Sequence, residues 1–162
     1  MDVSFVEYTE SFLDKTWFWL NDPLIKELTD TASFTRVEQR EWYNSLDGRK
    51  DYLVWGVVSD DEPVGVVGLK HIDYTTSEAE YFGFIGEKQE WGKGIGKQML
   101  EFAIEQALML GTKSLVLNVI PSNERAIRLY KSFGFSSDNL HNESNAHDRL
   151  LRMKKVLKKE NV

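Results

Sequence analysis

The chain contains no cysteine, only three prolines and only three histidines in its 162 residues. Without cysteine it has no disulfide, no thiolate nucleophile and no cysteine-ligated zinc, and a reducing cytoplasm is the compartment we expect. The histidines, His71, His141 and His147, are scattered through the sequence, so we expect no metal site.

Long apolar runs are also missing. None approaches the roughly 20 residues that a membrane-spanning helix requires. The opening residues, Met1-Asp2-Val3-Ser4, are acidic where a signal peptide would be basic. The sequence therefore favours a protein that does not act at a membrane.

What is present is the composition of one compact domain. Hydrophobic residues make up 41% and aromatic residues 12% of the chain, which is enough to form a core and predicts a single domain over residues 1–162. The formal charge of −6 argues against general affinity for nucleic acid. Residues 1–90 carry −11 and residues 91–162 carry +5. This division suggests a polyanionic ligand on one side and an amine on the other, although surface charge also clusters without function.

Periodicity predicts an α/β domain. The predicted order is strand, helix, helix, three strands, helix, strand, helix and two strands. Apolar spacing predicts a helix over residues 12–20 that stops at Asn21-Asp22-Pro23, and another from Ile95 to Leu108 with Gly111 just past its end. Thr35 and Glu38 form a capping box that opens a third helix, and Ser122 caps a fourth that Gly134 closes. Strands are expected at residues 3–6, 52–59, 64–72, 79–86, 114–120, 135–138 and 149–157. Short connections between consecutive strands imply antiparallel hairpins, so the fold class is a mixed, mostly antiparallel sheet of six to seven strands with about four helices.

A glycine-rich loop, Trp91-Gly92-Lys93-Gly94-Ile95-Gly96-Lys97, lies between a strand and an amphipathic helix. Unpaired N–H groups at a helix N-terminus, glycines that permit close approach and two lysines suit a pyrophosphate. A Walker loop requires Ser or Thr after Gly-Lys, but Gln98 follows. A dinucleotide fingerprint requires G-x-G-x-x-G, but the three glycines are spaced evenly by two. An acyl-CoA pyrophosphate loop fits, and a simple turn before a helix is the alternative.

A second motif lies about thirty residues downstream. It runs Asn123-x-x-Ala126-x-x-x-Tyr130 and ends at Gly134-Phe135. Asn123, Ile127 and Tyr130 share one helical face. Together with the glycine loop, this motif resembles the GNAT superfamily of acetyl-CoA-dependent N-acetyltransferases, over about residues 50–136. The family usually has Gln or Arg where this chain has Trp91.

The resemblance implies a cofactor site and a mechanism. Two central strands should splay apart to admit acetyl-CoA as co-substrate, and the amine should attack directly, with no covalent enzyme intermediate. The residues implied in binding the cofactor are Phe84, Ile85, Gly86, Trp91, Gly92, Lys93, Gly94, Ile95, Gly96, Lys97, Asn118, Asn123, Ala126 and Tyr130.

The resemblance also implies catalytic roles. A backbone N–H near Ile85 would bind the thioester carbonyl oxygen, and Tyr130 matches the general acid that protonates the leaving thiolate. Glu80 is the first candidate for the base that deprotonates the amine, followed by His71 and Asp73. Core packing for Tyr130 and a surface position for Glu80 are the structural alternatives.

The acceptor is less well specified than the cofactor. Trp19-Leu20-Asn21-Asp22-Pro23, with Phe34-Thr35 and Glu41-Trp42-Tyr43, resembles bacterial enzymes that acetylate the amino group of nucleotide-linked sugars, while Trp91 resembles ribosomal-protein N-terminal acetyltransferases. A small-molecule amine is therefore the expected partner, with an aminosugar first. A protein N-terminus or a polyamine, favoured by the acidic first half, and a non-catalytic acyl-CoA sensor are alternatives. A monomer or homodimer is expected.

Overall fold

The structure, a computed structural model, describes residues 1–138 and 149–157. The strands are β1 (Val3–Glu7), β2 (Leu53–Ser59), β3 (Glu62–Asp73), β4 (Glu78–Ile85), β5 (Ser114–Val119), β6 (Ser136–Ser137) and β7 (Leu151–Val156). The helices are α1 (Glu10–Asn21), α2 (Pro23–Leu28), α3 (Arg36–Ser45), α4 (Ile95–Met109) and α5 (Glu124–Ser132), with a 3-10 turn, η1, at Lys88–Glu90.

These strands form a single seven-stranded sheet with the order β1-β2-β3-β4-β5-β7-β6. Only β4 and β5 pair in parallel, and every other neighbouring pair is antiparallel. This arrangement confirms the predicted mixed, mostly antiparallel sheet.

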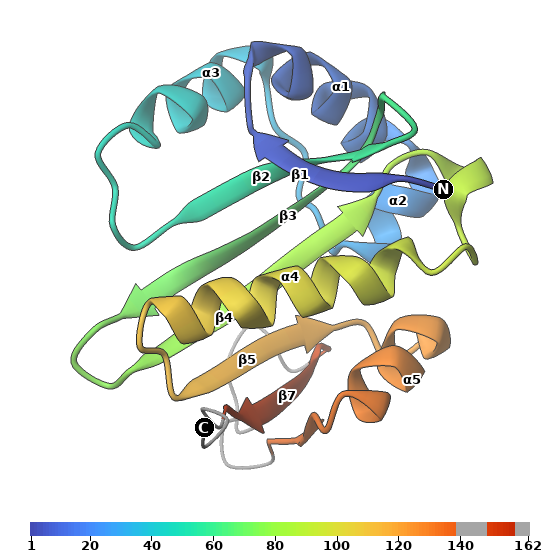
Figure 1. The fold of residues 1–162 in the computed structure, drawn as a ribbon. Helices are drawn as coiled ribbons and strands as arrows, with labels where there is room; N and C mark the ends of the chain where they lie inside the picture. The colour runs from blue at the N-terminus through green and yellow to red at the C-terminus, as the bar shows by residue number, and fades with distance from the viewer. Residues whose placement is uncertain (139–148, 158–162) are drawn as a thin grey trace.

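The parallel strands β4 and β5 pair over only a few residues. Residues from Glu78↔Ser114 to Glu80↔Val116 are in register, and the pairing of β4 with β5 then stops. Beyond that point β4 stays bonded to β3 as far as Ile85, and β5 stays bonded to β7 as far as Val119. The two central strands therefore diverge, as expected, and they do so toward the ends that precede the glycine loop and α5 (Figure 1).

Two hydrophobic clusters lie on the two faces of the sheet. One packs α4 and α5 against Leu69, Tyr81 and Leu117. The other packs α1 and part of α3 against Val66, Phe82 and Phe84. Because side chains alternate along a strand, Tyr81 belongs to one face of β4 and Phe82 and Phe84 to the other. In Figure 1, α4 crosses the sheet in front of β4 and β5, and α5 lies beside β5 and β7.

Several local predictions are confirmed. Thr35 and Glu38 form the capping box, with Oγ1 of Thr35 accepting from the Glu38 N–H at 3.1 Å and Glu38 Oε1 accepting from the Thr35 N–H at 3.0 Å. Gly111 and Gly134 follow α4 and α5 with φ of 79° and 91°, the left-handed conformation that ends helices at glycine.

Other predictions were wrong in detail. The first helix ends at Asn21 as predicted, but a second short helix that was not predicted starts at Pro23. It forms because Asp22 Oδ1 accepts from the N–H groups of Leu24 and Ile25 and Pro23 needs no donor partner. The cap of α5 is Asn123 rather than Ser122. The strand expected over residues 135–138 is reduced to Ser136–Ser137. The polar loop expected at residues 139–148 lies outside the described residues.

Candidate active site

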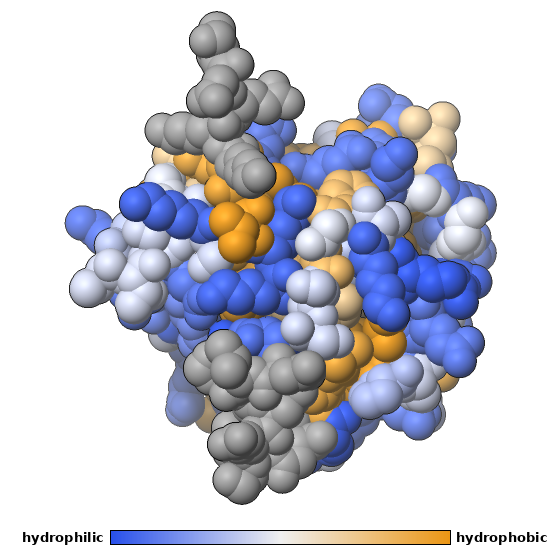
Figure 2. Space-filling view, turned by 90° about the horizontal axis from the view of Figure 1, so that it is seen from below, coloured by the Kyte–Doolittle hydropathy of each residue, from blue (hydrophilic) through white to orange (hydrophobic). Residues whose placement is uncertain are grey.

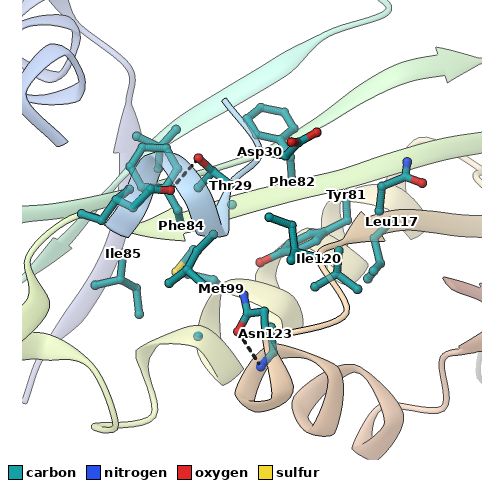
Figure 3. Close-up of a pocket in the computed structure, with 18 of the residues that line it drawn as sticks. Thr29, Asp30, Tyr81, Phe82, Phe84, Ile85, Met99, Leu117, Ile120 and Asn123 are labelled. Carbon is teal, nitrogen blue, oxygen red and sulfur yellow. Dashed lines mark hydrogen bonds between the residues drawn. The ribbon is translucent and has the colours of Figure 1, made fainter. Parts of the chain in front are cut away.

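A cleft with a volume of about 1560 Å³ occupies the gap between the diverging strands. Its lining includes both faces of β4, the N-terminal end of α4, the first turns of α5 and the segment between α2 and α3. Figure 2, seen from below the view of Figure 1, shows apolar surface between hydrophilic side chains. Figure 3 shows Asn123 and Ile120 at one side of the pocket and Asp30 with Phe82 at another.

The glycine loop forms one end of this cleft. Gly92, Gly94, Ile95, Gly96 and Lys97 all line it. Gly94 is the N-cap of α4 with φ of 87°, a backbone conformation that glycine adopts without strain. Gln98 is the first residue whose N–H closes a helical turn, onto the Gly94 carbonyl. The preceding amides of the first turn thus point outward with the positive end of the helix dipole, which suits a phosphate group.

Trp91 connects this loop to the sheet. Its indole Nε1–H donates a hydrogen bond of 2.9 Å to the backbone carbonyl of Ile85, at the end of β4. The ring also lines the cleft. The residue that departs from the usual family motif therefore joins the glycine loop to the end of β4 by a hydrogen bond.

The orientation of the β4 backbone follows from its pairing with β3. The Gly86 N–H donates to the Val64 carbonyl of β3 at 2.7 Å. Because the amides of successive strand residues point to opposite edges, those of Gly83 and Ile85 point away from β3, toward the gap. The expected N–H donor near Ile85 is thus directed into the cleft at the place where β5 has diverged.

The start of α5 forms the opposite wall. Asn123 caps this helix, its Oδ1 accepting from the Ala126 N–H at 3.3 Å. Asn118, Asn123, Ala126 and Tyr130 all line the cleft, so the second sequence motif faces the first across the gap.

Tyr130 is packed between two rings. Its centroid lies 6.1 Å from that of Tyr81 and 6.0 Å from that of Phe135. Burial raises the pKa of Tyr130 to about 12, so the phenol remains protonated, and hence a donor, throughout the neutral range. Burial, with Tyr130 as a neighbour, also raises the pKa of Tyr81. The Tyr81 side chain points into the pocket in Figure 3.

The far end of the cleft combines rings and carboxylates. Trp42, Tyr52 and Phe82 contact one another edge to face or tilted, with centroids 5.4 to 5.9 Å apart, and all three line the cleft. Burial raises the pKa of Tyr52 to about 12. Three carboxylates also line this end: Asp30, Glu38 and Glu80.

Two of these carboxylates are held by basic groups. Asp30 makes a two-pronged pair with Arg149, at 3.0 Å from Nε and 2.8 Å from Nη2. Glu80 lies 3.0 Å from Nδ1 of His71 and 3.6 Å from Nζ of Lys70, and its side chain is only 13% exposed. The first candidate for the base is therefore inside the cleft and bonded to the second candidate, whereas Asp73 instead accepts from the N–H groups of Thr75 and Thr76.

Two predicted cofactor residues are not among those that line the cleft. Lys93 Nζ pairs with Glu90 at 3.5 Å. Gly86 packs against Trp19, whose indole ring leaves no room for a Cβ at that position. The absence of a side chain at Gly86 thus allows the end of β4 to pack closely against α1. The contributions of Gly86 and Lys93 to cofactor binding stay predictions.

Sequence reasoning missed several lining residues, among them Asp30, Tyr81, Arg125 and Arg128. Tyr81 follows Glu80 in the sequence, but its side chain points to the opposite face of β4 because side chains alternate along a strand. It therefore lies beside Tyr130, a contact that the sequence does not reveal. Arg125 and Arg128 line the cleft from α5 and add two cations to Lys97 at the end where the glycine loop lies. Because α5 is strongly amphipathic, its sequence could have indicated that Arg125 and Arg128 lie on a polar face of the helix.

Within residues 1–138 and 149–157, no group of three or more His, Cys, Asp or Glu side chains is placed to hold a metal ion. His141 and His147 lie outside these ranges. None of the described helices is long and apolar enough to cross a membrane.

A sheet that splays at a glycine-loop helix, with a buried phenol facing the gap, defines an acyl-CoA-dependent transferase. The model of the acetyltransferase (GNAT) family matches residues 13–135. The chain belongs to this family.

Solved structures share the fold over nearly the whole chain. A spermidine N-acetyltransferase from Vibrio cholerae, in complex with CoA and spermine, superposes with a TM-score of 0.82 at 19% identity, covering 95% of each chain. A domain from Methanocaldococcus jannaschii gives a TM-score of 0.81 at 20% identity, covering 96% of this chain and 99% of that one. At these identities the likeness shows the fold.

Curated relatives match over shorter stretches. An uncharacterized protein of M. jannaschii is 24% identical over 132 residues, which is 80% of this chain and 27% of the relative. A spermine/spermidine N(1)-acetyltransferase of Bacillus subtilis is 43% identical over 53 residues, which is 32% of this chain and 34% of the relative. The matched part of this chain thus spans about a third or less of these relatives.

Proposed function

We propose that this N-acetyltransferase moves the acetyl group of acetyl-CoA to a primary amine of a small polyamine. The observation that carries the proposal is the division of charge along a single cleft. On α4 and α5, the cations Lys97, Arg125 and Arg128 outnumber the single carboxylate Glu124. At the other end, the carboxylates Asp30, Glu38 and Glu80 outnumber Lys70, and Arg149 pairs with Asp30. Arg152 of β7 also lines the cleft. A polyanionic acyl donor and a cationic acceptor would each meet groups of opposite charge.

At the donor end, the first-turn amides of α4 would bind the pyrophosphate, with Lys97 and the arginines of α5 nearby. The Ile85 N–H would donate a hydrogen bond to the thioester carbonyl oxygen and stabilise the negative charge that develops on this oxygen during attack. The amine attacks this carbonyl carbon directly, the C–N bond forms and the C–S bond breaks.

Tyr130 would supply the proton for the leaving thiolate. A phenol with a pKa of about 12 is a weak acid toward a thiol of ordinary pKa near 8.5. The same apolar cleft raises the pKa of a thiolate that forms inside it, which reduces the mismatch. The second proton of the attacking nitrogen returns Tyr130 to its neutral form.

Glu80 would accept the first proton of the acceptor ammonium. Five steps along β4 separate Glu80 from Ile85, a distance of about 17 Å, so a chain of waters must carry the proton between the attacking nitrogen and the carboxylate. The role of Glu80 is therefore that of a base acting through water.

The acceptor class rests on charge and on relatives. The sequence motifs favour a nucleotide-linked aminosugar, but a nucleotide diphosphate would bring negative charge to the end of the cleft that Asp30, Glu38 and Glu80 line. A relative that matches part of this chain is a spermine/spermidine acetyltransferase by name, as is a structural neighbour that binds spermine. A polyamine is the acceptor that best fits these facts.

A nucleotide-linked aminosugar remains the second candidate because of one feature. Trp42, Tyr52 and Phe82 offer ring surfaces in the acceptor end on which a base or sugar could stack. A protein N-terminus is a further acceptor class, and a non-catalytic acyl-CoA sensor is the alternative that involves no turnover.

The test is release of free thiol from acetyl-CoA with a panel of amines: spermidine, spermine, a nucleotide-linked aminosugar and an N-terminal peptide. We expect turnover with the polyamines, with a KM that rises with salt because the attraction is electrostatic. Turnover with the aminosugar alone would overturn the acceptor class. Calorimetric binding of acetyl-CoA without turnover across the whole panel would favour the sensor.

The cellular setting and assembly belong to the same proposal. The absence of cysteine is consistent with cytoplasmic action. A monomer or homodimer stays the prediction, although one structural neighbour is described as dodecameric.

A further inference from the structure

The pairing of β3 with β4 contains a bulge beside Glu80. Lys70 is in register with Glu80 and Asp73 with Glu78, so three steps along β3 match two steps along β4. The extra residue falls at His71, whose φ is +50°. Ile72 keeps its place in the core, at 6% exposed, and its N–H donates to the Asp51 carbonyl at 3.1 Å.

The bulge changes which side chains reach Glu80. In a regular strand, consecutive side chains point to opposite faces. Here the consecutive residues Lys70 and His71 both contact the carboxylate of Glu80, at 3.6 Å and 3.0 Å. The left-handed backbone conformation at His71 is unfavourable for a residue other than glycine. This conformation brings the imidazole to Glu80, whereas regular strand pairing would direct the side chain of His71 to the opposite face of the sheet.

The two partners differ sharply in exposure. The Glu80 side chain is 13% exposed and the His71 side chain is 74% exposed, and both line the cleft. The pair thus spans the distance from a carboxylate inside the cleft to bulk water.

The reaction requires such a path. At neutral pH an alkylamine is protonated, so acetyl transfer converts an ammonium and a thioester into an amide, a thiol and one free proton. In the proposed mechanism this proton reaches Glu80, and a carboxylic acid that is only 13% exposed must lose it before the next turnover.

We propose that His71 relays this proton from Glu80 to solvent, an inference that rests on the proposed role of Glu80. Nδ1 of the neutral imidazole takes the proton from Oε1 of protonated Glu80, which restores the carboxylate and forms imidazolium. The exposed ring then gives a proton to water or buffer and returns to neutral imidazole. His71 acts through Glu80 and does not contact the acceptor. Imidazole suits the task because it exchanges protons readily near neutral pH.

Other charged groups surround this pair and will influence its pH dependence. From β3 there are Lys70 and Asp73, from β4 Glu80 itself, and from the segment before β2 Asp51 and Tyr52, with Arg49 paired to Asp51 at 2.9 Å. A neutral substitution at Lys70 changes the charge beside Glu80 without removing a proton carrier, and Lys70→Met is therefore the matched control for His71→Ala.

The experiment measures kcat of His71→Ala in a weak, dilute buffer and then with added imidazole. We expect kcat to fall about tenfold or more, and to recover with imidazole in a saturable manner, while the KM for acetyl-CoA stays within twofold of the wild-type value. Lys70→Met and Glu80→Gln should show no imidazole rescue. A His71→Ala enzyme as fast as wild type in dilute buffer would overturn the relay, and so would a loss that imidazole does not restore.

Failure of the relay can be told apart from failure of the proposed function. If wild type turns over and Glu80→Gln does not, but His71→Ala is unaffected, the transfer mechanism stands and the relay falls. If Glu80→Gln retains wild-type kcat, Glu80 is not the base, and both that role and the relay fall. Far-ultraviolet circular dichroism of each variant checks that the bulge substitution leaves the fold intact.

Discussion

Trp91 shows how one side chain can replace another that a family usually carries. Glutamine and arginine, the usual residues at this position, can donate hydrogen bonds from long polar side chains. The indole provides one donor, Nε1–H, which reaches the Ile85 carbonyl at 2.9 Å. The sequence showed the departure from the motif but not this bond, because the partner is a backbone atom of another element.

Trp91→Phe keeps an aromatic ring, although a smaller one, and removes this donor. Since a neutral hydrogen bond contributes about 1 kcal/mol, we expect the KM for acetyl-CoA to rise about fivefold, with kcat changed less because the reacting groups are untouched. Steady-state kinetics with acetyl-CoA varied provides the measurement. Trp17→Phe, on α1 and away from the cleft lining, is the control, and an equal effect in both variants would contradict the role of the bond.

Tyr130 carries the sharpest prediction about chemistry. Tyr130→Phe removes the proposed proton donor and leaves the ring packing with Tyr81 and Phe135. We expect kcat to fall about tenfold to a hundredfold, with the affinity for CoA nearly unchanged. Stopped-flow or steady-state thiol release measures kcat, and calorimetry measures affinity. Tyr43→Phe, outside the cleft lining, controls for loss of a phenol; wild-type kcat in Tyr130→Phe would remove this residue from the acid role.

At the level of elements, the parts of the fold with strong local signals were predicted correctly. The capping box of α3, the glycine ends of α4 and α5 and the long strands follow from side-chain chemistry within a few residues. Helix α2 was missed because Asn-Asp-Pro signals an end of helix as readily as a start, and here Asp22 caps the next helix. The bulge at His71 depends on pairing with β4 and leaves no local signal in the sequence.

The α4 loop allows a test that separates charge from shape. Gly94 has φ of 87° and open space where a Cβ would be, and asparagine and aspartate both tolerate the left-handed conformation. We expect Gly94→Asp to weaken CoA binding about a hundredfold or more, because a carboxylate would face the pyrophosphate. The nearly isosteric Gly94→Asn should weaken it much less. Calorimetry with CoA compares the two, and equal affinities would place the pyrophosphate elsewhere.

At the scale of the whole molecule, the first half of the sequence is acidic and the second half is basic. Both halves contribute residues to the cleft. The acidic first half supplies Asp30, Glu38 and Glu80, and the basic second half supplies Lys97, Arg125 and Arg128. Composition could predict this division, but only the diverging strands bring the two groups to one cleft. The sequence could not identify the acceptor. The aromatic residues that suggest a sugar, Trp42 and Tyr43, also pack against the hydrophobic core beside α3.

The same burial that keeps Tyr130 protonated makes stability depend on alkaline pH. The pKa of Tyr130 is raised from 10.0 to about 12, so between these values the folded protein keeps a proton that the unfolded chain has lost. The free energy of unfolding therefore falls as pH rises through this window, and the contribution is fully present below pH 10. Urea denaturation at pH 9 and at pH 11 should show the decrease, which buried Tyr52 shares. Tyr130→Phe should make the decrease smaller, whereas Tyr74→Phe, 55% exposed, should leave it unchanged. An identical pH dependence in wild type and Tyr130→Phe would mean that this phenol is not shielded from water in the folded protein, and the pKa argument for its role as a proton donor would then fail as well.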